Sequence, residues 1–297
     1  MTPATRGALL VAAAATCWST GGVAVRFMDA GPWEAAFWRS VFLALAVGAY
    51  VVWRHRGGTA TAFRAMGWRG PASGVAVAGS SLFYFVALAE ASVATVLVLM
   101  STTPLLTALL ARVVLGERIG AATLLAILAT MAGIAIMVGP VDLLAGGWRG
   151  LLGLGVSLFG AINIVVVRGT RPGTDMVPAV VLSGLVLAGV AGFVGAPWEV
   201  SGRDIAICAF MGTVQVGLGL TLFVQGIALL PAARAGLLTL TETVLAPLWA
   251  WLGVGEVPDR RTLTGGGLIL AALAAYALWQ GRPGRRPGLA AAAPRKL

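Results

Sequence analysis

The chain has 297 residues, of which 59% are hydrophobic and only 11% are charged. A soluble domain carries about 25% charged residues, so this chain lacks the groups needed to face water, and lipid must be its main solvent. Its formal charge of +10 does not indicate nucleic-acid binding, because the Lys and Arg residues lie at the ends of apolar segments and form no stripe that could line a groove.

Apolar runs long enough to cross a bilayer follow one another along the whole chain. A hydrocarbon core of about 30 Å needs roughly 20 apolar residues in a helix. The first run continues from Gly7 past Val25, so it is predicted to be a span and no cleavable signal. The sequence predicts an all-α membrane protein with ten transmembrane helices over 7–27, 33–53, 71–90, 92–115, 120–139, 149–168, 176–195, 204–230, 233–254 and 262–280.

The charges between these spans predict how the chain is oriented. An even number of spans places both termini on one side, and most of the 21 Lys and Arg residues fall toward that side. The largest basic loop, residues 54–70, is among them. By the positive-inside rule, we expect a multi-pass protein of the inner (plasma) membrane with both termini cytoplasmic.

One segment of the chain occurs twice. Residues Ala94 to Glu117 return as Ala233 to Glu256 at a constant shift, with Gly116-Glu117 matched by Gly255-Glu256. Each half holds five predicted spans, an odd number, so the second copy must enter from the opposite side of the membrane. Such inverted-topology repeats are typical of transporters, with the substrate site near the midplane between the repeats.

The predicted domains follow from this duplication. Residues 1–139 form the first five-helix repeat and residues 140–281 the second. The remaining segment, 282–297, is basic and rich in Pro and Ala, and we expect it to be a disordered cytoplasmic tail.

Two stretches of the repeat, 104–117 (PLLTALLARVVLGE) and 241–256 (TETVLAPLWAWLGVGE), carry a resemblance to a known family. Together with CWSTGGVAVR (17–26) and the later Arg39, they resemble the EamA-type transporters of the drug/metabolite transporter superfamily. The resemblance covers roughly residues 7–280. It implies a ten-helix bundle that moves small metabolites, and the bacterial amino-acid exporters of the YddG kind are the nearest expectation. The family usually has Glu-Pro in the second copy, whereas this chain has Glu242-Thr243.

Glu242 is the sharpest single candidate for the substrate site. It lies near the middle of the ninth predicted span, where a carboxylate facing lipid would cost about 2.5–3.5 kcal/mol on insertion scales. Either it faces a cavity and binds a substrate amine or a coupling proton, or it is a structural carboxylate paired inside the bundle. Arg39, about a third of the way into the second span, is its cationic counterpart and has the same two interpretations.

The polar run Ser101-Thr102-Thr103 precedes Pro104 in the middle of the fourth span. Pro104 should free the carbonyl of residue 100 and bend the helix, and broken helices at the midplane form substrate sites. The alternative is a Ser/Thr kink without ligand contact. In the second copy the matching residues include Thr241, and Pro247 one turn later leaves the position of any bend in the ninth span open.

Several further side chains could line the substrate site with rings or hydrogen-bonding groups. Each could equally be a packing or interfacial residue. These candidates are Trp18, Ser19, Trp38, Tyr84 and Asn163.

No motif in the sequence indicates an enzyme or a cofactor. Cys17 and Cys208 lie in apolar segments, and the single histidine, His55, lies in a basic loop, so no metal cluster is expected. The sequence therefore predicts a secondary transporter that exports a small-molecule substrate, such as an amino acid, through the lipid bilayer. Glu242 permits proton coupling. A channel-like facilitator and a lipid or drug flippase remain alternatives, whereas an intramembrane enzyme lacks a nucleophile–base pair.

Overall fold

The computed structural model describes residues 2–90, 96, 99–117, 119–139, 151–195, 198–255, 257 and 259–280. Ala94 at the start of the first repeat copy, Glu256 at the end of the second and the tail 282–297 lie outside these residues. Every regular element in the described part is helical, as the sequence predicts. The helices are α1 Pro3–Ser19, α2 Gly21–Val25, α3 Pro32–His55, α4 Thr59–Ala65, α5 Arg69–Glu90, α7 Thr103–Val114, α8 Ala121–Val138, α9 Leu152–Arg168, α10 Pro178–Val194, α11 Gly202–Phe210, the π-helix η2 Met211–Leu218, α12 Gly219–Ile227, α13 Ala232–Thr239, α14 Thr241–Val254 and α15 Arg260–Gln280.

Within the described residues, seven helical stretches are long and apolar enough to cross a membrane. The first joins α1 and α2, another joins α11, η2 and α12, and a third joins α13 and α14. Three shorter apolar helices, α7, α9 and α10, overlap the predicted spans 92–115, 149–168 and 176–195. The chain is therefore a multi-pass helical membrane protein.

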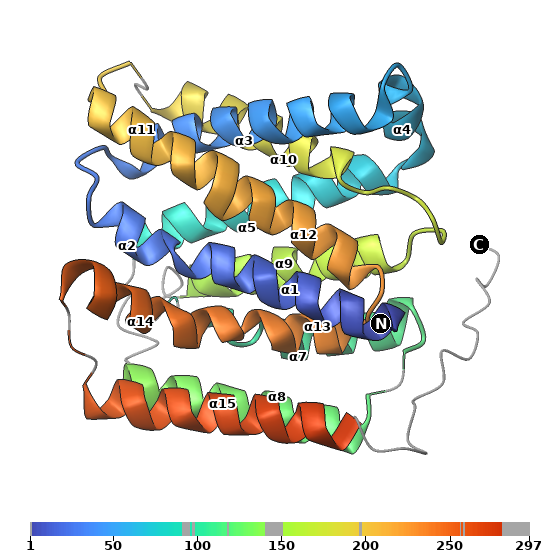
Figure 1. Cartoon of the computed structure of the whole chain (residues 1–297), viewed down its shortest axis with the longest axis vertical. Coiled ribbons are helices and arrows are strands. Elements are labelled where there is room, and N and C mark those ends of the chain that lie inside the picture. The colour runs from blue at the N-terminus through green and yellow to red at the C-terminus, as the bar shows by residue number, and fades with distance from the viewer. Residues whose placement is uncertain are drawn as a thin grey trace.

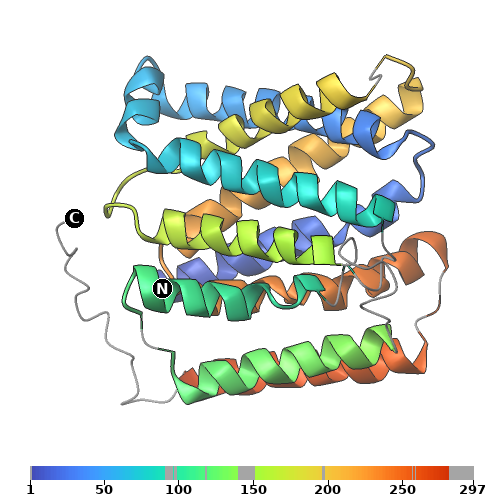
Figure 2. The same ribbon diagram turned by 180° about the vertical axis from the view of Figure 1, so that it is seen from behind.

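The helices lie side by side with roughly parallel axes (Figures 1 and 2). α3 and α10 pack together along one edge, and α8 packs against α15 along the other. Between these edges, α1, α12 and α14 lie on the face seen in Figure 1, whereas α5, α7 and α9 lie on the face seen in Figure 2. The bundle thus has two central layers, one of α1, α12 and α14 and one of α5, α7 and α9. They lie between the pairs α3–α10 and α8–α15.

Local sequence explains where the helices begin. Thr2 caps α1 by accepting the Thr5 N–H at 3.2 Å, with Pro3 in the first turn, where its missing N–H costs nothing. Ser201 caps α11 by accepting the Asp204 N–H at 3.1 Å. Asp259 precedes α15 and accepts the Thr262 backbone N–H at 2.7 Å, and this bond lowers the pKa of its carboxyl group.

Two clusters of buried apolar residues hold the bundle together. One joins α1, α3, α9, α10 and α12, and the other joins α7, α8, α13 and α15 around Ile127, Leu237 and Ile269. Many large apolar side chains instead face outward, among them Val113 and Phe193 with 83% and 94% of their surface exposed. Such exposure suits helices whose solvent is lipid.

Candidate functional site

The first repeat copy contains a broken helix at the predicted place. Ser101 and Thr102 form a turn immediately before α7. The hydroxyl of Thr103 donates to the Met100 carbonyl at 2.7 Å, which is the carbonyl that Pro104 leaves without its helical partner. The hydroxyl of Thr102 donates to the Leu99 carbonyl at 2.6 Å.

A hydroxyl from another span also bonds to this turn. Ser157 of α9 donates to the Leu99 carbonyl at 2.8 Å and accepts from the Thr103 hydroxyl at 3.0 Å. The carbonyls of Leu99 and Met100 are therefore satisfied by side chains from both repeats. Ser157 carries no sequence signal of its own, because a serine in an apolar span is identified as a partner only when the facing helix is known.

The second copy is broken at the corresponding place. α13 ends at Thr239, Leu240 forms a turn, and α14 begins at Thr241. Leu240 corresponds to Ser101 in the repeat alignment. Pro247 lies inside α14, so the interruption occurs seven residues before it. Because the interruption recurs without a proline beside it, it is a property of the repeat and is not caused by proline alone.

The two copies also end alike. Gly116 and Gly255 adopt left-handed backbone conformations with φ of 68° and 73°. Only glycine adopts this conformation without steric cost. The conserved pairing of Gly116 with Gly255 in the duplicated segment therefore has a structural cause at the ends of α7 and α14.

Arg39 lies in α3 with 9% of its surface exposed. Its guanidinium carbon is 4.8 Å from the centroid of the Phe85 ring, a cation–π contact. It also borders a very small cavity together with Ser40, Ser81 and Ser183. Among the described residues, its side chain has no hydrogen bond or ion pair, so a buried cation is left without an anionic partner.

Tyr84 and Glu242 are two further candidates whose polar groups lack a hydrogen-bond or ion-pair partner among the described residues. Glu242 lies in the first turn of α14 and is half-buried. Tyr84 lies in α5 next to Phe85, whose ring Arg39 contacts. No hydrogen bond or ion pair in the described part of the chain involves the carboxylate of Glu242 or the hydroxyl of Tyr84. A cation in α3, a hydroxyl in α5 and a carboxylate in α14 thus have no hydrogen-bond or ion-pair partner in the described part of the chain.

The remaining candidates have protein partners. Ser19 donates to the Thr16 carbonyl at 2.7 Å and accepts from the Trp249 indole at 2.8 Å. Asn163 is buried and accepts from the Ser73 hydroxyl at 2.6 Å, which ties α9 to α5. These bonds give both residues a structural role in this conformation.

Both tryptophan candidates, Trp18 and Trp38, pack against other aromatic rings. Trp18 contacts Phe223 edge-on at a centroid distance of 5.0 Å. Trp38 contacts Phe37 and Phe42 at 5.4 and 6.1 Å. Neither is brought by an observed contact to the group formed by Arg39, Tyr84 and Glu242.

A second irregular region joins the first and eighth predicted spans. The helix of the first span is interrupted at Thr20, and the eighth span contains the π-helix η2. Gln215 of η2 donates from Nε2 to the Trp18 carbonyl at 3.2 Å, and its buried Oε1 has no partner. π-Helices often occur at functional sites. Here the π-helix places Gln215 beside the interruption between α1 and α2.

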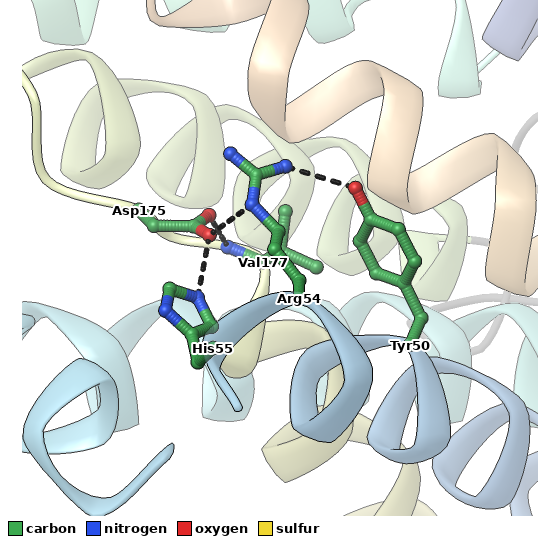
Figure 3. A network of polar contacts seen from close by, with 5 residues as sticks. All are labelled: Tyr50, Arg54, His55, Asp175 and Val177. Atoms are coloured by element: carbon green, nitrogen blue, oxygen red, sulfur yellow. Dashed lines mark hydrogen bonds and ion pairs between the residues drawn. The ribbon is translucent and has the colours of Figure 1, made fainter. Parts of the chain in front are cut away.

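Charged contacts link the two repeats at the end of the bundle where α1 begins and α3, α7 and α9 end. Asp175, between α9 and α10, accepts from Arg54 Nε at 3.3 Å and lies 3.0 Å from His55 Nε2 (Figure 3). The other carboxylate oxygen of Asp175 accepts the Val177 N–H at 3.0 Å, and Arg54 also donates to the Tyr50 hydroxyl at 2.9 Å.

Glu117 forms a second link at the same end. Its carboxylate accepts from Arg168 Nε at 3.2 Å and from the Ala232 backbone N–H at 2.9 Å. Ala232 begins α13, so the carboxylate both pairs with a cation and caps a helix N-terminus. The sequence repeat pairs Glu117 with Glu256, but only the fold identifies the partners of Glu117 in the second repeat.

The described residues contain no group of three or more His, Cys, Asp or Glu side chains that could hold a metal ion. Among the described residues, the polar groups without a hydrogen-bond or ion-pair partner include the guanidinium of Arg39, the phenol of Tyr84 and the carboxylate of Glu242, besides the buried Oε1 of Gln215. These groups suit recognition of a small polar molecule by complementary charge.

Comparisons with known proteins identify the family of the chain. The model of the EamA-like transporter family matches residues 5–139 and again residues 147–278. A solved structure described only as a crystal structure of a protein has 21% sequence identity and a TM-score of 0.77, with 93% of this chain and 97% of that chain covered. No curated protein matches the chain. Because the two family matches span most of its length, the chain belongs to the EamA-like transporter family of the drug/metabolite transporter superfamily.

Proposed function

We propose that the chain exports small zwitterionic metabolites, with amino acids as the first class to test, across the inner (plasma) membrane by alternating access. Arg39 would bind the substrate carboxylate and Glu242 the substrate amine, and the Tyr84 hydroxyl would offer a further hydrogen bond. The observation that carries this proposal is that all three groups lie in helices without a hydrogen-bond or ion-pair partner among the described residues, although Arg39 contacts the Phe85 ring. A zwitterion would supply both missing charges at once.

The chemistry of the three groups favours a zwitterion over other substrates. A guanidinium matches a carboxylate with two parallel hydrogen bonds. A carboxylate within a span is stabilised by a substrate ammonium ion. Sugar phosphates and nucleotide sugars would require several deep cations, and Arg39 is the cation that the described part of the chain places in this group.

Alternating access is supported by the repeat and by the two interrupted helices. Five predicted spans per copy would invert the second copy, so that α7 and α14 approach the midplane from opposite sides. At the end where α1 begins, Glu117 and Asp175 tie the first repeat to the second. Breaking these links while forming equivalent contacts at the other end would expose the site to each side in turn.

Orientation and direction complete the proposal. The excess of Lys and Arg toward the side of the termini supports cytoplasmic termini. The export direction rests on the resemblance to exporters of this family. On this orientation, the Glu117 and Asp175 links lie on the cytoplasmic side.

Counterflow in proteoliposomes tests the proposal. Vesicles preloaded with an unlabelled amino acid should accumulate the labelled form, and uptake should saturate with concentration. The panel should include amines, sugars and carboxylic acids, with and without a pH gradient. Saturable counterflow restricted to zwitterions supports the carrier; non-saturating flux without counterflow would instead indicate a channel, and transport of labelled lipid alone would indicate a flippase.

A further inference from the structure

A sizeable cavity among the described residues is lined by none of Arg39, Tyr84 and Glu242. It is a groove of about 760 Å³ between α2, α11 and α14. Such a volume falls within the roughly 300–1,000 Å³ of small-molecule pockets. In Figure 1, α2 lies between α11 and α14 on the face toward the viewer.

The walls of the groove are apolar and rich in aromatic rings. Phe210 and Leu252 keep 43% and 65% of their surface exposed, which leaves apolar surface for a ligand to cover. The hydroxyl of Thr20 is already used, because it donates to the Cys17 carbonyl at 2.7 Å. The main apolar lining side chains are Val23, Phe27, Ile207, Phe210, Trp249 and Leu252.

One charged side chain borders this apolar surface. Arg203 lies in the first turn of α11, at the end of the bundle, and is exposed. Within the described residues it has no hydrogen bond or ion pair. The neighbouring acid, Asp204, does not neutralise it, because Asp204 is buried and accepts from the Asp29 N–H at 3.1 Å and from Ser201 at 2.9 Å.

We propose that this groove binds an anionic phospholipid, with one acyl chain between α2, α11 and α14 and the headgroup phosphate on Arg203. A guanidinium at the end of a span lies at the depth of lipid phosphates and binds them through charge-assisted hydrogen bonds. An acyl chain requires no polar partner from the walls. A zwitterionic metabolite fits less well, because no acidic side chain lines the groove to receive its ammonium group.

This inference concerns a site separate from the proposed substrate site, so either can fail alone. The lipid would lie against α2, α11 and α14, which belong to spans that carry an interruption or the π-helix. A bound chain would fill the space between these segments and stabilise the conformation described. We therefore expect phospholipid to raise the melting temperature of the protein.

The test uses the full chain, delipidated in detergent and titrated with phosphatidylglycerol, with binding followed by native mass spectrometry and by thermal shift. Arg203→Gln should weaken binding about five-fold, the effect of one basic residue near an anionic membrane surface. Arg203→Lys should retain most of the affinity. Ala206→Phe, which places a ring in the groove, should abolish the thermal shift. Arg260→Gln, at an exposed arginine of the same end, is the matched control and should bind like the unmodified protein.

Binding and competition measurements with other ligands identify which part of the phospholipid is recognised. Phosphatidylcholine with the same acyl chains should bind about five-fold more weakly, because its headgroup has no net charge. Glycerol phosphate, which has the anion without the chains, should not compete, and neither should an amino-acid mixture. Equal affinity of Arg203→Gln and the unmodified protein, an unaffected Ala206→Phe variant, or competition by glycerol phosphate or amino acids would overturn the proposal.

Discussion

The two copies of the interrupted helix place different chemistry at the same position. In the first copy, the hydroxyls of Thr102, Thr103 and Ser157 satisfy the carbonyls of Leu99 and Met100. In the second copy, the interruption at Leu240 is followed by Glu242, whose carboxylate has no partner among the described residues. The first copy is thus a closed hydrogen-bonding structure, whereas the second presents an unused charge. A duplicated segment can keep its backbone geometry while one copy takes on recognition.

The largest expected effect follows from removing that charge. Glu242→Gln keeps the size of the side chain but removes the partner proposed for the substrate ammonium group. Loss of one charge-assisted hydrogen bond of about 1.5–3 kcal/mol should lower transport efficiency at least about tenfold. Counterflow rates at matched protein levels measure this effect. Thr264→Val, in the peripheral helix α15, where the hydroxyl donates to the Arg260 carbonyl of the same helix at 2.9 Å, is the comparison and should reduce transport much less.

Arg39 tests whether the second charge belongs to the same site. Arg39→Lys keeps the charge but cannot form two parallel hydrogen bonds with a carboxylate. We expect the apparent substrate affinity to fall about tenfold, with a smaller change in maximal rate. Concentration series in counterflow separate the two parameters. A fall in maximal rate alone would assign Arg39 to folding or motion.

Glu117 tests the link between the repeats. In Glu117→Gln, the Ala232 N–H loses its charged acceptor, so the first turn of α13 should open more often. Hydrogen exchange of the backbone amides at residues 232–235 should accelerate about three- to tenfold, equivalent to roughly 1 kcal/mol of cap energy. Asp175→Asn disrupts the other link and should leave these amides unchanged. Equal acceleration in both variants would mean that the whole end loosens as one unit.

The hydrogen bonds that satisfy the Leu99 and Met100 carbonyls in the first copy predict an effect on stability. Ser157→Ala leaves the buried Leu99 carbonyl with one partner fewer and should destabilise the protein by about 1–3 kcal/mol. The matched control is Ser183→Ala, because the Ser183 hydroxyl bonds only the Val180 carbonyl of its own helix, at 2.8 Å. Thermal unfolding in one detergent compares them. Equal melting temperatures for both variants would remove the special role given to Ser157.

The smallest effect is expected where the two copies touch. A Cβ at Gly236 of α13 would lie 3.2 Å from the Cα of Pro104, so Gly236→Ala should cost about 1 kcal/mol through overpacking. Gly267→Ala, where a Cβ meets nothing within 4 Å, is the control and should be neutral or slightly stabilising. Unfolding temperatures of both variants check the contact. An unchanged Gly236→Ala would show that the contact between the copies relaxes freely.

Much of the architecture could be predicted from the sequence because lipid imposes a simple rule on every span. Apolar length predicts the helices, and the family is confirmed by matches over both halves. The turn before Pro104 could be predicted because proline acts on its own helix. The turn at Leu240 could not, because no local residue marks it and only its position in the repeat does.

Tertiary contacts explain what the sequence left open. The eighth predicted span contains the π-helix Met211–Leu218, which no local sequence pattern predicts. Only the fold shows that Gln215 reaches the Trp18 carbonyl. Likewise, whether Glu242 and Arg39 pair with each other depends on packing, and in the described structure no ion pair joins them.

The most direct test measures substrate recognition by Glu242 itself. The inhibition constants of a transported amino acid and of its analogue without the amino group should be compared in counterflow, for the unmodified protein and for Glu242→Gln. The unmodified protein should prefer the amino acid at least about tenfold, and the variant should lose most of this preference. An unchanged preference in the variant would contradict the assignment of the substrate amine to Glu242.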